Sequence, residues 1–136
     1  MGGLAGGCKW SGGALAPNGK IYGVPYSSES VLIVDPSAGA TDTSSVVGLA
    51  GAYKWSGGVL AGNGKVYGVP YSAEAVLIVD PIAGTADSTT LGVGLSGRHK
   101  WSGGVLADSG KIYGMPYHSE SLLVIDPILG LSLIHI

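Results

Sequence analysis

The chain has 136 residues and a mass of 13.5 kDa, the size of a single domain. Only 12% of its residues are charged, 46% are apolar, 25 are glycine, and the net charge is −2, which excludes a charge-rich disordered segment and a polybasic nucleic-acid binder. No apolar run reaches the roughly 18–20 residues of a membrane span, and residues 1–8 lack the pattern of a secretory signal. We therefore expect no nucleic-acid or membrane partner, and the sequence assigns no cellular compartment.

An internal repeat dominates the sequence. The segment Lys-Trp-Ser-Gly-Gly begins at Lys9, Lys54 and Lys100, so the copies are spaced 45 and then 46 residues apart. When the copies are aligned from these lysines, 18 of 31 positions are identical in all three. A fixed period of this length is typical of stacked structural units. We therefore treat 1–136 as one repeat domain, with units at approximately 9–53, 54–99 and 100–130.

The first two predicted strands of each copy form a hairpin, described here in the middle copy. Gly57–Ala61 is the first strand, and the turn Gly62–Gly64 can supply the positive φ values that a tight hairpin needs. Lys65–Tyr71 is a second, β-rich stretch. Because proline cannot donate a ladder hydrogen bond, we expect this strand to end at Pro70, and the equivalent strands to end at Pro25 and Pro116.

The third and fourth predicted strands differ in character. Ala75–Val79 contains an unbroken apolar run and is expected to be covered on both faces, whereas Thr85–Leu91 is polar and suits an exposed outer strand. No segment has the apolar spacing and caps of a helix, so the fold class is all-β. Unlike charges are expected to face each other across the second and third strands and to fix their register; the pairs are Lys20 with Asp35, Lys65 with Asp80, and Lys111 with Asp126.

Four antiparallel strands in about 45 residues describe a β-propeller blade. Gly57–Val69 followed by Val76–Gly84 resembles the blade repeats of YVTN-type, NHL-type and gluconolactonase-type propellers. This resemblance implies a partial β-propeller of about three blades from a longer array, because closed propellers have about four to eight. The alternative is a β-trefoil-like fold, which also has three repeats of about this length.

The two ends of the chain depart from the repeat. Gly3–Gly6 matches Gly48–Gly51 and Gly94–Gly97, which precede the later copies, so we interpret residues 1–8 as the tail of a preceding blade. Residues 131–136 replace the expected polar fourth strand, so we expect a non-native tail and an incomplete third blade. An arc of blades leaves an open flank at each end, and we therefore expect the chain to associate with itself.

A candidate ligand-binding face follows from the strand order, because the loop before strand one and the loop after strand two lie at the same end of a blade. The sequence places a Lys-Trp pair in the first loop and a Tyr and a Glu in the second. The twelve candidate residues are Lys9, Trp10, Tyr26, Glu29, Lys54, Trp55, Tyr71, Glu74, Lys100, Trp101, Tyr117 and Glu120.

Each candidate also has a structural interpretation. The tryptophans are expected to fill the seams between blades, with a sugar-stacking platform as the alternative. The lysines are expected to pair with the glutamates of their own copy, with Lys54 near Glu74, for example. Mutation of Glu74 to Gln would test a role in binding a polar ligand.

The sequence indicates no catalytic residue, metal site or cofactor. His99 and His118 are in separate loops without a ligand motif, and Cys8 has no identifiable base. We therefore predict a binding or interaction scaffold for an unidentified protein or glycan. Two alternatives remain: a carbohydrate-binding, lectin-like propeller with one site per blade, and part of a gluconolactonase-like hydrolytic propeller whose catalytic acids lie in other blades.

Overall fold

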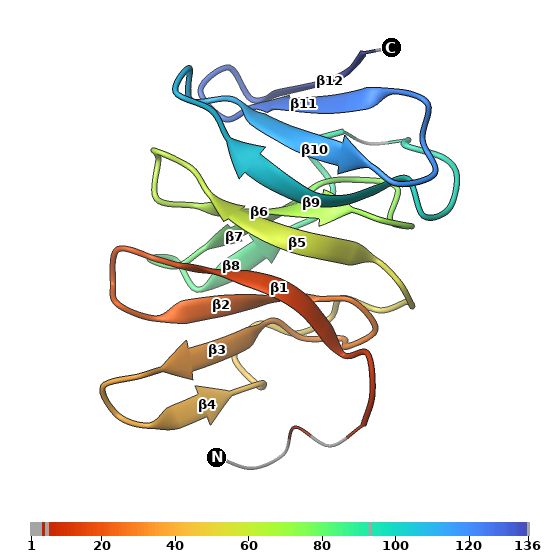
Figure 1. The fold of residues 1–136 in the computed structure, drawn as a ribbon. Helices are drawn as coiled ribbons and strands as arrows, with labels where there is room; N and C mark the ends of the chain where they lie inside the picture. Colours follow the sequence, from red (N-terminus) through yellow and green to blue (C-terminus); the bar gives the residue numbers. More distant parts are fainter. Residues whose placement is uncertain (1–3, 5, 93, 136) are drawn as a thin grey trace.

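The computed structural model describes residue 4 and residues 6–92 and 94–135. It is all-β and contains three four-stranded antiparallel sheets, each built from one copy of the repeat (Figure 1). Blade 1 contains β1 (Trp10–Leu15), β2 (Ile21–Pro25), β3 (Leu32–Asp35) and β4 (Ala40–Asp42). Blade 2 contains β5 (Trp55–Leu60), β6 (Val66–Pro70), β7 (Leu77–Asp80) and β8 (Thr85–Asp87). Blade 3 contains β9 (Trp101–Leu106), β10 (Ile112–Pro116), β11 (Leu122–Asp126) and β12 (Leu131–His135).

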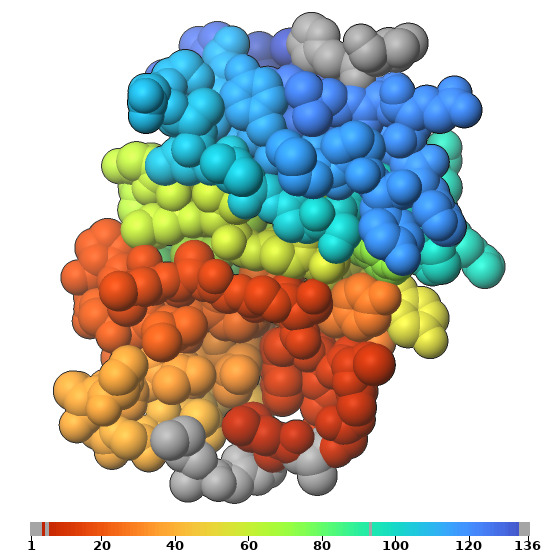
Figure 2. Space-filling view, viewed as in Figure 1, coloured from red at the N-terminus to blue at the C-terminus, as the bar shows by residue number. Residues whose placement is uncertain are grey.

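The strand order within each sheet follows the chain, so the blades have the meander topology expected for a partial propeller. The trefoil alternative is wrong, because among the described residues no sheet takes strands from two copies. The blades stack in chain order, as the successive red-orange, yellow-green and cyan-blue bands of Figure 2 show. In the part of the chain that is described there is no helix, and hence no helix long and apolar enough to cross a membrane.

The innermost strands β1, β5 and β9 lie side by side. A Cβ added to Gly57 would lie 2.6 Å from the Cα of Gly103, and one added to Gly12 would lie 2.8 Å from the Cα of Gly57. The repeated glycines therefore permit a backbone approach that no other residue allows. Beside them, the Ser56 hydroxyl lies 3.1 Å from the hydroxyls of both Ser11 and Ser102.

The second strands end at their prolines, as expected, and the irregularity of the hairpin lies in the inner strand. Trp10 pairs with Pro25 and Gly13 with Gly23, so β1 has one residue more than β2 between these pairs. The bulge includes Gly12, whose φ is 75°. The same register shift occurs in the other two blades.

The predicted charge pairing of strands two and three agrees with the register. Ile21 pairs with Val34 in blade 1, which sets Lys20 opposite Asp35. The Ser37 hydroxyl and the amides of the same turn hold the pKa of Asp35 below its usual value, and the charge of Lys20 contributes less. The turn is therefore stabilised chiefly by its own hydrogen bonds.

The fourth strand of blade 2 is shorter than expected, ending at Asp87 instead of Leu91. The Asp87 carboxylate accepts hydrogen bonds from the Thr89 amide and hydroxyl, both at 2.8 Å, and these bonds turn the chain out of the sheet. The predicted strand, Thr85–Leu91, was too long because Thr89 and Thr90 hydrogen-bond to Asp87 in this turn and do not continue the strand.

The expectation of an incomplete third blade is corrected by β12, which pairs with β11 from Asp126↔Leu131 to Leu122↔His135. The reason is that an open strand edge offers backbone groups to any extended segment that the preceding turn directs alongside it. The fit is imperfect, because Ser132 Oγ is a buried oxygen without a hydrogen-bond partner among the described residues. The non-native origin of 131–136 stays a prediction.

Two apolar clusters fill the seams between blades. At the first seam, Val24 of blade 1 packs with Val66 and Leu77 of blade 2. At the second, Val69 of blade 2 packs with Ile112 and Leu123 of blade 3. All of these side chains are at most 1% exposed, so the seams form the core of the structure.

Candidate functional site

Two of the three lysines of the candidate face, Lys54 and Lys100, are structural parts of the seams, whereas Lys9 is half-buried at the flank of blade 1. Lys54 is 5% exposed, and its Nζ donates to the carbonyl oxygens of Gly51 at 2.6 Å and Ser28 at 2.7 Å. Lys100 is 6% exposed and donates to those of Gly97 at 2.7 Å and Ala73 at 2.8 Å. Each ammonium group therefore joins its own blade to the preceding one, and burial lowers the pKa of both lysines.

The expected pairing of each lysine with the glutamate of its own copy differs from the structure. The carboxylate whose charge acts on Lys54 is Glu29, and the one acting on Lys100 is Glu74; both belong to the preceding copy. Each lysine therefore lies near the glutamate of the preceding blade and not of its own, because the loop that carries the lysine crosses the seam.

The tryptophans fill the seams, and their indole N–H groups are satisfied. Trp55 and Trp101 are only 3% and 2% exposed, and each donates to a backbone carbonyl of its own blade, at Ala75 and Ser121. Trp10 donates in the same way to Ser30 at 2.8 Å, although its ring is only half-buried. Trp55 and Trp101 therefore present no ring face on which a sugar could stack.

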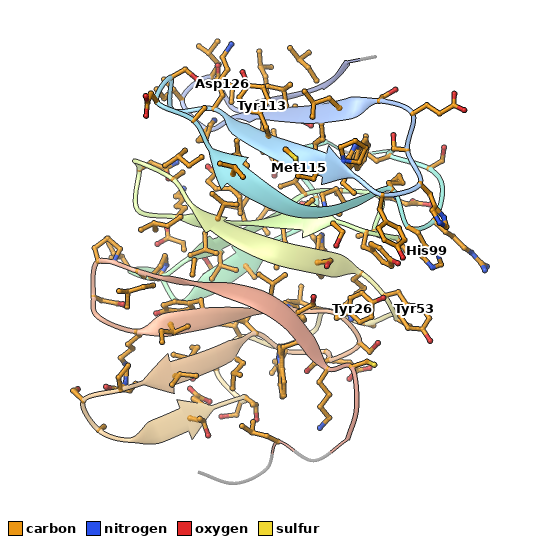
Figure 3. All side chains as sticks on the ribbon, viewed as in Figure 1. Tyr26, Tyr53, His99, Tyr113, Met115 and Asp126 are labelled. Atoms are coloured by element: carbon orange, nitrogen blue, oxygen red, sulfur yellow. The ribbon has the colours of Figure 1, made fainter. Side chains whose placement is uncertain are left out.

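A continuous group of aromatic rings occupies the same end of the blades. We call it the ring row, and it consists of Tyr26, Tyr53, Tyr71, His99, Tyr117 and His118. The Tyr71 and His99 rings are stacked with centroids 4.7 Å apart, and those of Tyr117 and His118 are stacked at 4.9 Å. The three blades all contribute to the row, and its labelled members Tyr26, Tyr53 and His99 lie near one another in Figure 3.

Backbone geometry sets the rings at this end. Tyr53 and His99 each precede an invariant lysine, and both have φ of 53°, a left-handed conformation that is rare for residues with a large side chain. Cys8 is the equivalent residue of the first copy, with φ of 56°. Backbone strain repeated at one position is typical of sites where a side chain must point in a set direction.

The loop tyrosines are tied to the same segments by backbone hydrogen bonds. The Tyr71 amide donates to the Lys54 carbonyl at 2.8 Å, and the Lys54 amide donates to the Tyr26 carbonyl at 2.8 Å. Lys100 makes the corresponding bonds with Tyr71 and Tyr117. The ring row is thus anchored to the seams. The loops before strand one and after strand two meet as the sequence predicted.

The ring row combines apolar ring surface with polar edges. Tyr53 is 49% and Tyr117 59% exposed, while Tyr26 and Tyr71 are half-buried. Partial desolvation and the neighbouring phenols raise the pKa of Tyr71 to about 12, so its hydroxyl keeps its proton to a higher pH than that of a free tyrosine.

A separate pocket, which we call the seam pocket, lies on blade 2 beside the loop that joins this blade to blade 1. Its volume is about 480 Å³, and its walls come from the loop joining the two blades, from the loop after β6, and from the residues following β8. Ser72, Glu74, Ser88 and Thr89 give it three hydroxyls and a carboxylate, and Lys54 also lines it. Such a lining can exchange hydrogen bonds with a polyhydroxylated molecule.

The sequence prediction therefore located this end of the blades but not all of its exposed residues. Tyr26, Tyr71 and Tyr117 are in the ring row, Glu74 lines the seam pocket, and Glu29 and Glu120 are exposed. Tyr53 and His99 were missed as site residues, although variation next to a lysine repeated in every copy was a usable signal, and His118 was taken for a surface residue of the same loop as Tyr117. Within 4, 6–92 and 94–135, no group of three or more His, Cys, Asp and Glu residues could hold a metal ion.

No protein-family model and no curated protein matches the chain. Among solved structures, a catalytically inactive virginiamycin B lyase from Staphylococcus aureus, determined with quinupristin, is similar at a TM-score of 0.74 and 10% identity, over 96% of this chain and 42% of that chain. Hydrazine synthase from Kuenenia stuttgartiensis is similar at a TM-score of 0.70 and 16% identity, over 98% of this chain and 38% of that one.

An auxiliary nutrient-binding protein from Bacteroides ovatus has a TM-score of 0.66 at 17% identity, over 92% of this chain and 31% of that one. The chain thus spans less than half the length of each of these structures. At such identities the likeness concerns the fold alone. Together with three four-stranded meander sheets, it identifies the chain as an arc of three β-propeller blades.

Proposed function

We propose that the chain is a binding scaffold whose ligand surface is the ring row. The observation that carries this proposal is that the rings are accessible while two of the three repeated lysines and two of the three tryptophans beside them are buried. A rigid base that holds exposed tyrosines and histidines offers large, amphipathic contact area at little conformational cost. Such a surface suits a peptide or protein segment with apolar side chains and backbone carbonyls.

A carbohydrate ligand is the second candidate, and the seam pocket favours it. Its hydroxyls and the Glu74 carboxylate match the hydrogen-bonding groups of a sugar, and repetition of the blades would create one such pocket per seam. A lectin-like site of this kind would bind a sugar through hydrogen bonds from hydroxyls and a carboxylate. It would not use stacking on Trp55 and Trp101, because both rings are buried.

The solved neighbours do not choose between binding and catalysis, because they include lyases as well as a nutrient-binding protein. The gluconolactonase-like alternative assigns its catalytic acids to blades outside this sequence, and it stays a prediction.

The experiment is to screen the chain against a peptide array and a glycan array, together with Tyr53→Asn and Glu74→Gln. Asparagine tolerates the positive φ at position 53, so the fold is retained while the ring is lost. Ile82→Asn is the matched control, because Ile82 is 97% exposed in the β7–β8 turn and belongs to neither site.

Peptide binding that falls at least tenfold in Tyr53→Asn and is unchanged in Ile82→Asn supports the ring row as the ligand surface. Glycan binding lost in Glu74→Gln alone would transfer the function to the seam pocket. Binding to neither array, or binding equally reduced in the control, would overturn the scaffold proposal.

A further inference from the structure

The two seams inside the chain are built in the same way. Val24 of blade 1 lies against Gly58 and Gly68 of blade 2, where added Cβ atoms would be 2.6 and 3.2 Å from its methyl groups. Val69 of blade 2 lies in the same way against Gly104 and Gly114 of blade 3, at 3.0 and 3.4 Å. Each seam is therefore a branched side chain inserted between two glycines of the next blade.

Blade 3 presents the projecting half of such a seam at its outward flank. Met115 is the equivalent of Val24 and Val69, yet it is 41% exposed whereas they are 1% and 0% exposed. Val105 is 59% exposed, although its equivalent Val59 is 7% exposed. Figure 3 shows Met115 on β10 in this blade. These are seam side chains without the covering blade that their equivalents have.

Blade 1 presents the receiving half. Ile21 is 36% exposed, whereas its equivalents Val66 and Ile112 are both fully buried at 0%. The paired glycines of this flank are Gly13 and Gly23, at the positions of the glycines that receive Val24 and Val69 at the internal seams.

The hydrogen bonds that cross the internal seams have counterparts at the outer flanks, where one flank carries the donor and the other carries the acceptor. Lys100 joins blade 3 to the Ala73 carbonyl of blade 2, and by the repeat Lys9 would reach the Ser119 carbonyl of another blade 3. The neighbouring hydroxyls of Ser11, Ser56 and Ser102 form a row that ends at Ser102 on the flank of blade 3 and at Ser11 on the flank of blade 1. One flank thus carries the donors and glycines that fit the acceptors and side chains of the other.

We propose that two copies of this chain assemble head to tail, with blade 3 of each copy docked on blade 1 of the other. The contact repeats the two internal seams, so it continues an interface that the fold already uses. Two copies supply six blades, within the range of about four to eight in which propellers close, so the two new seams complete a ring and leave no open flank. The inference is independent of the ligand proposed above.

Sedimentation of the full chain is expected to give a mass about twice the 13.5 kDa of one chain. Met115→Glu places a charge in the new seam and should yield the single-chain mass with an unchanged near-ultraviolet circular dichroism spectrum. Ile128→Glu is the matched control, because Ile128 is 81% exposed in the β11–β12 turn of the same blade, and it should retain the doubled mass.

Cysteine crosslinking tests the head-to-tail arrangement separately. In a Cys8→Ser background, chains with Ser11→Cys are mixed with chains carrying Ser102→Cys, because the internal serine pairs are 3.1 Å apart. A disulfide-linked pair should form in the mixture and not with either variant alone.

A single-chain mass for the wild type would overturn the proposal, as would crosslinking of one variant with itself. A mass that keeps growing with concentration would show open polymers and would refute the closed ring.

Discussion

Replacement of Gly57 by alanine, compared with the same replacement at Gly103, isolates the close approach of the inner strands. The two glycines occupy the same place in successive copies and have similar φ values, 89° and 76°. A Cβ at position 57 would lie 2.6 Å from the Cα of Gly103 and 3.1 Å from its nitrogen, whereas one at position 103 meets no atom within 4 Å. The two alanine variants therefore have the same kind of backbone strain, but only Gly57→Ala adds a steric clash.

The expected magnitudes follow from these two contributions. A left-handed backbone costs an alanine roughly 1–2 kcal/mol, so Gly103→Ala should lower the free energy of unfolding by about that amount. Relieving a 2.6 Å contact requires β5 and β9 to separate, and overpacking of this kind costs about 1–3 kcal/mol more. Gly57→Ala should therefore lose about 2–5 kcal/mol in total.

The assay is urea unfolding followed by tryptophan fluorescence, with both variants in the Met115→Glu background. That background is needed because the proposed assembly would place Gly103 against a second copy and add a clash there. Equal destabilisation of the two variants, or a larger loss for Gly103→Ala, would refute the role assigned to the glycines.

Three further predictions compare equivalent positions or a single titrating group. In the same Met115→Glu background, Lys100→Met should lower the free energy of unfolding by about 2–3 kcal/mol because it removes two charge-assisted hydrogen bonds, whereas Lys9→Met should change it by no more than about 0.5 kcal/mol; equal losses in urea unfolding would contradict this. The raised pKa of Tyr71 means that the folded state retains a proton that the unfolded state loses, so stability should fall as pH rises from about 10 to 12. Tyr71→Phe should reduce this decline, and parallel stability–pH curves would disprove it. In that background Trp55→Ala should cost about 3–5 kcal/mol and Trp10→Ala less, because only Trp55 is fully enclosed within one chain; thermal melts that rank them in the opposite order would count against the seam role.

The local signals of the sequence were sufficient for the architecture. The spacing of the invariant lysines set the length of a blade, and the proline at the end of each second strand marked its boundary correctly, as at Pro70. These features depend on backbone constraints within one copy, and such constraints act regardless of what packs against the sheet.

The candidate site was predicted less completely because its contacts cross between copies. Lys54 binds the carbonyl of Ser28 in the preceding blade, and no pattern within one repeat indicates that partner. The left-handed backbone at Tyr53 and His99 was also hidden, because tyrosine and histidine are not residues that signal a positive φ. Knowledge of the seam, which is tertiary structure, was needed to separate the buried lysines from the exposed rings.

The β12 strand has a broader consequence for this architecture. Its sequence, Leu-Ser-Leu-Ile-His, has nothing in common with β4 or β8, and yet it runs along the whole of β11. The rim of a blade thus accepts unrelated sequence, provided that the preceding turn delivers it in an extended form. The rim is accordingly where such a protein can take up foreign peptides, fusion junctions or sequence drift while its axis stays unchanged.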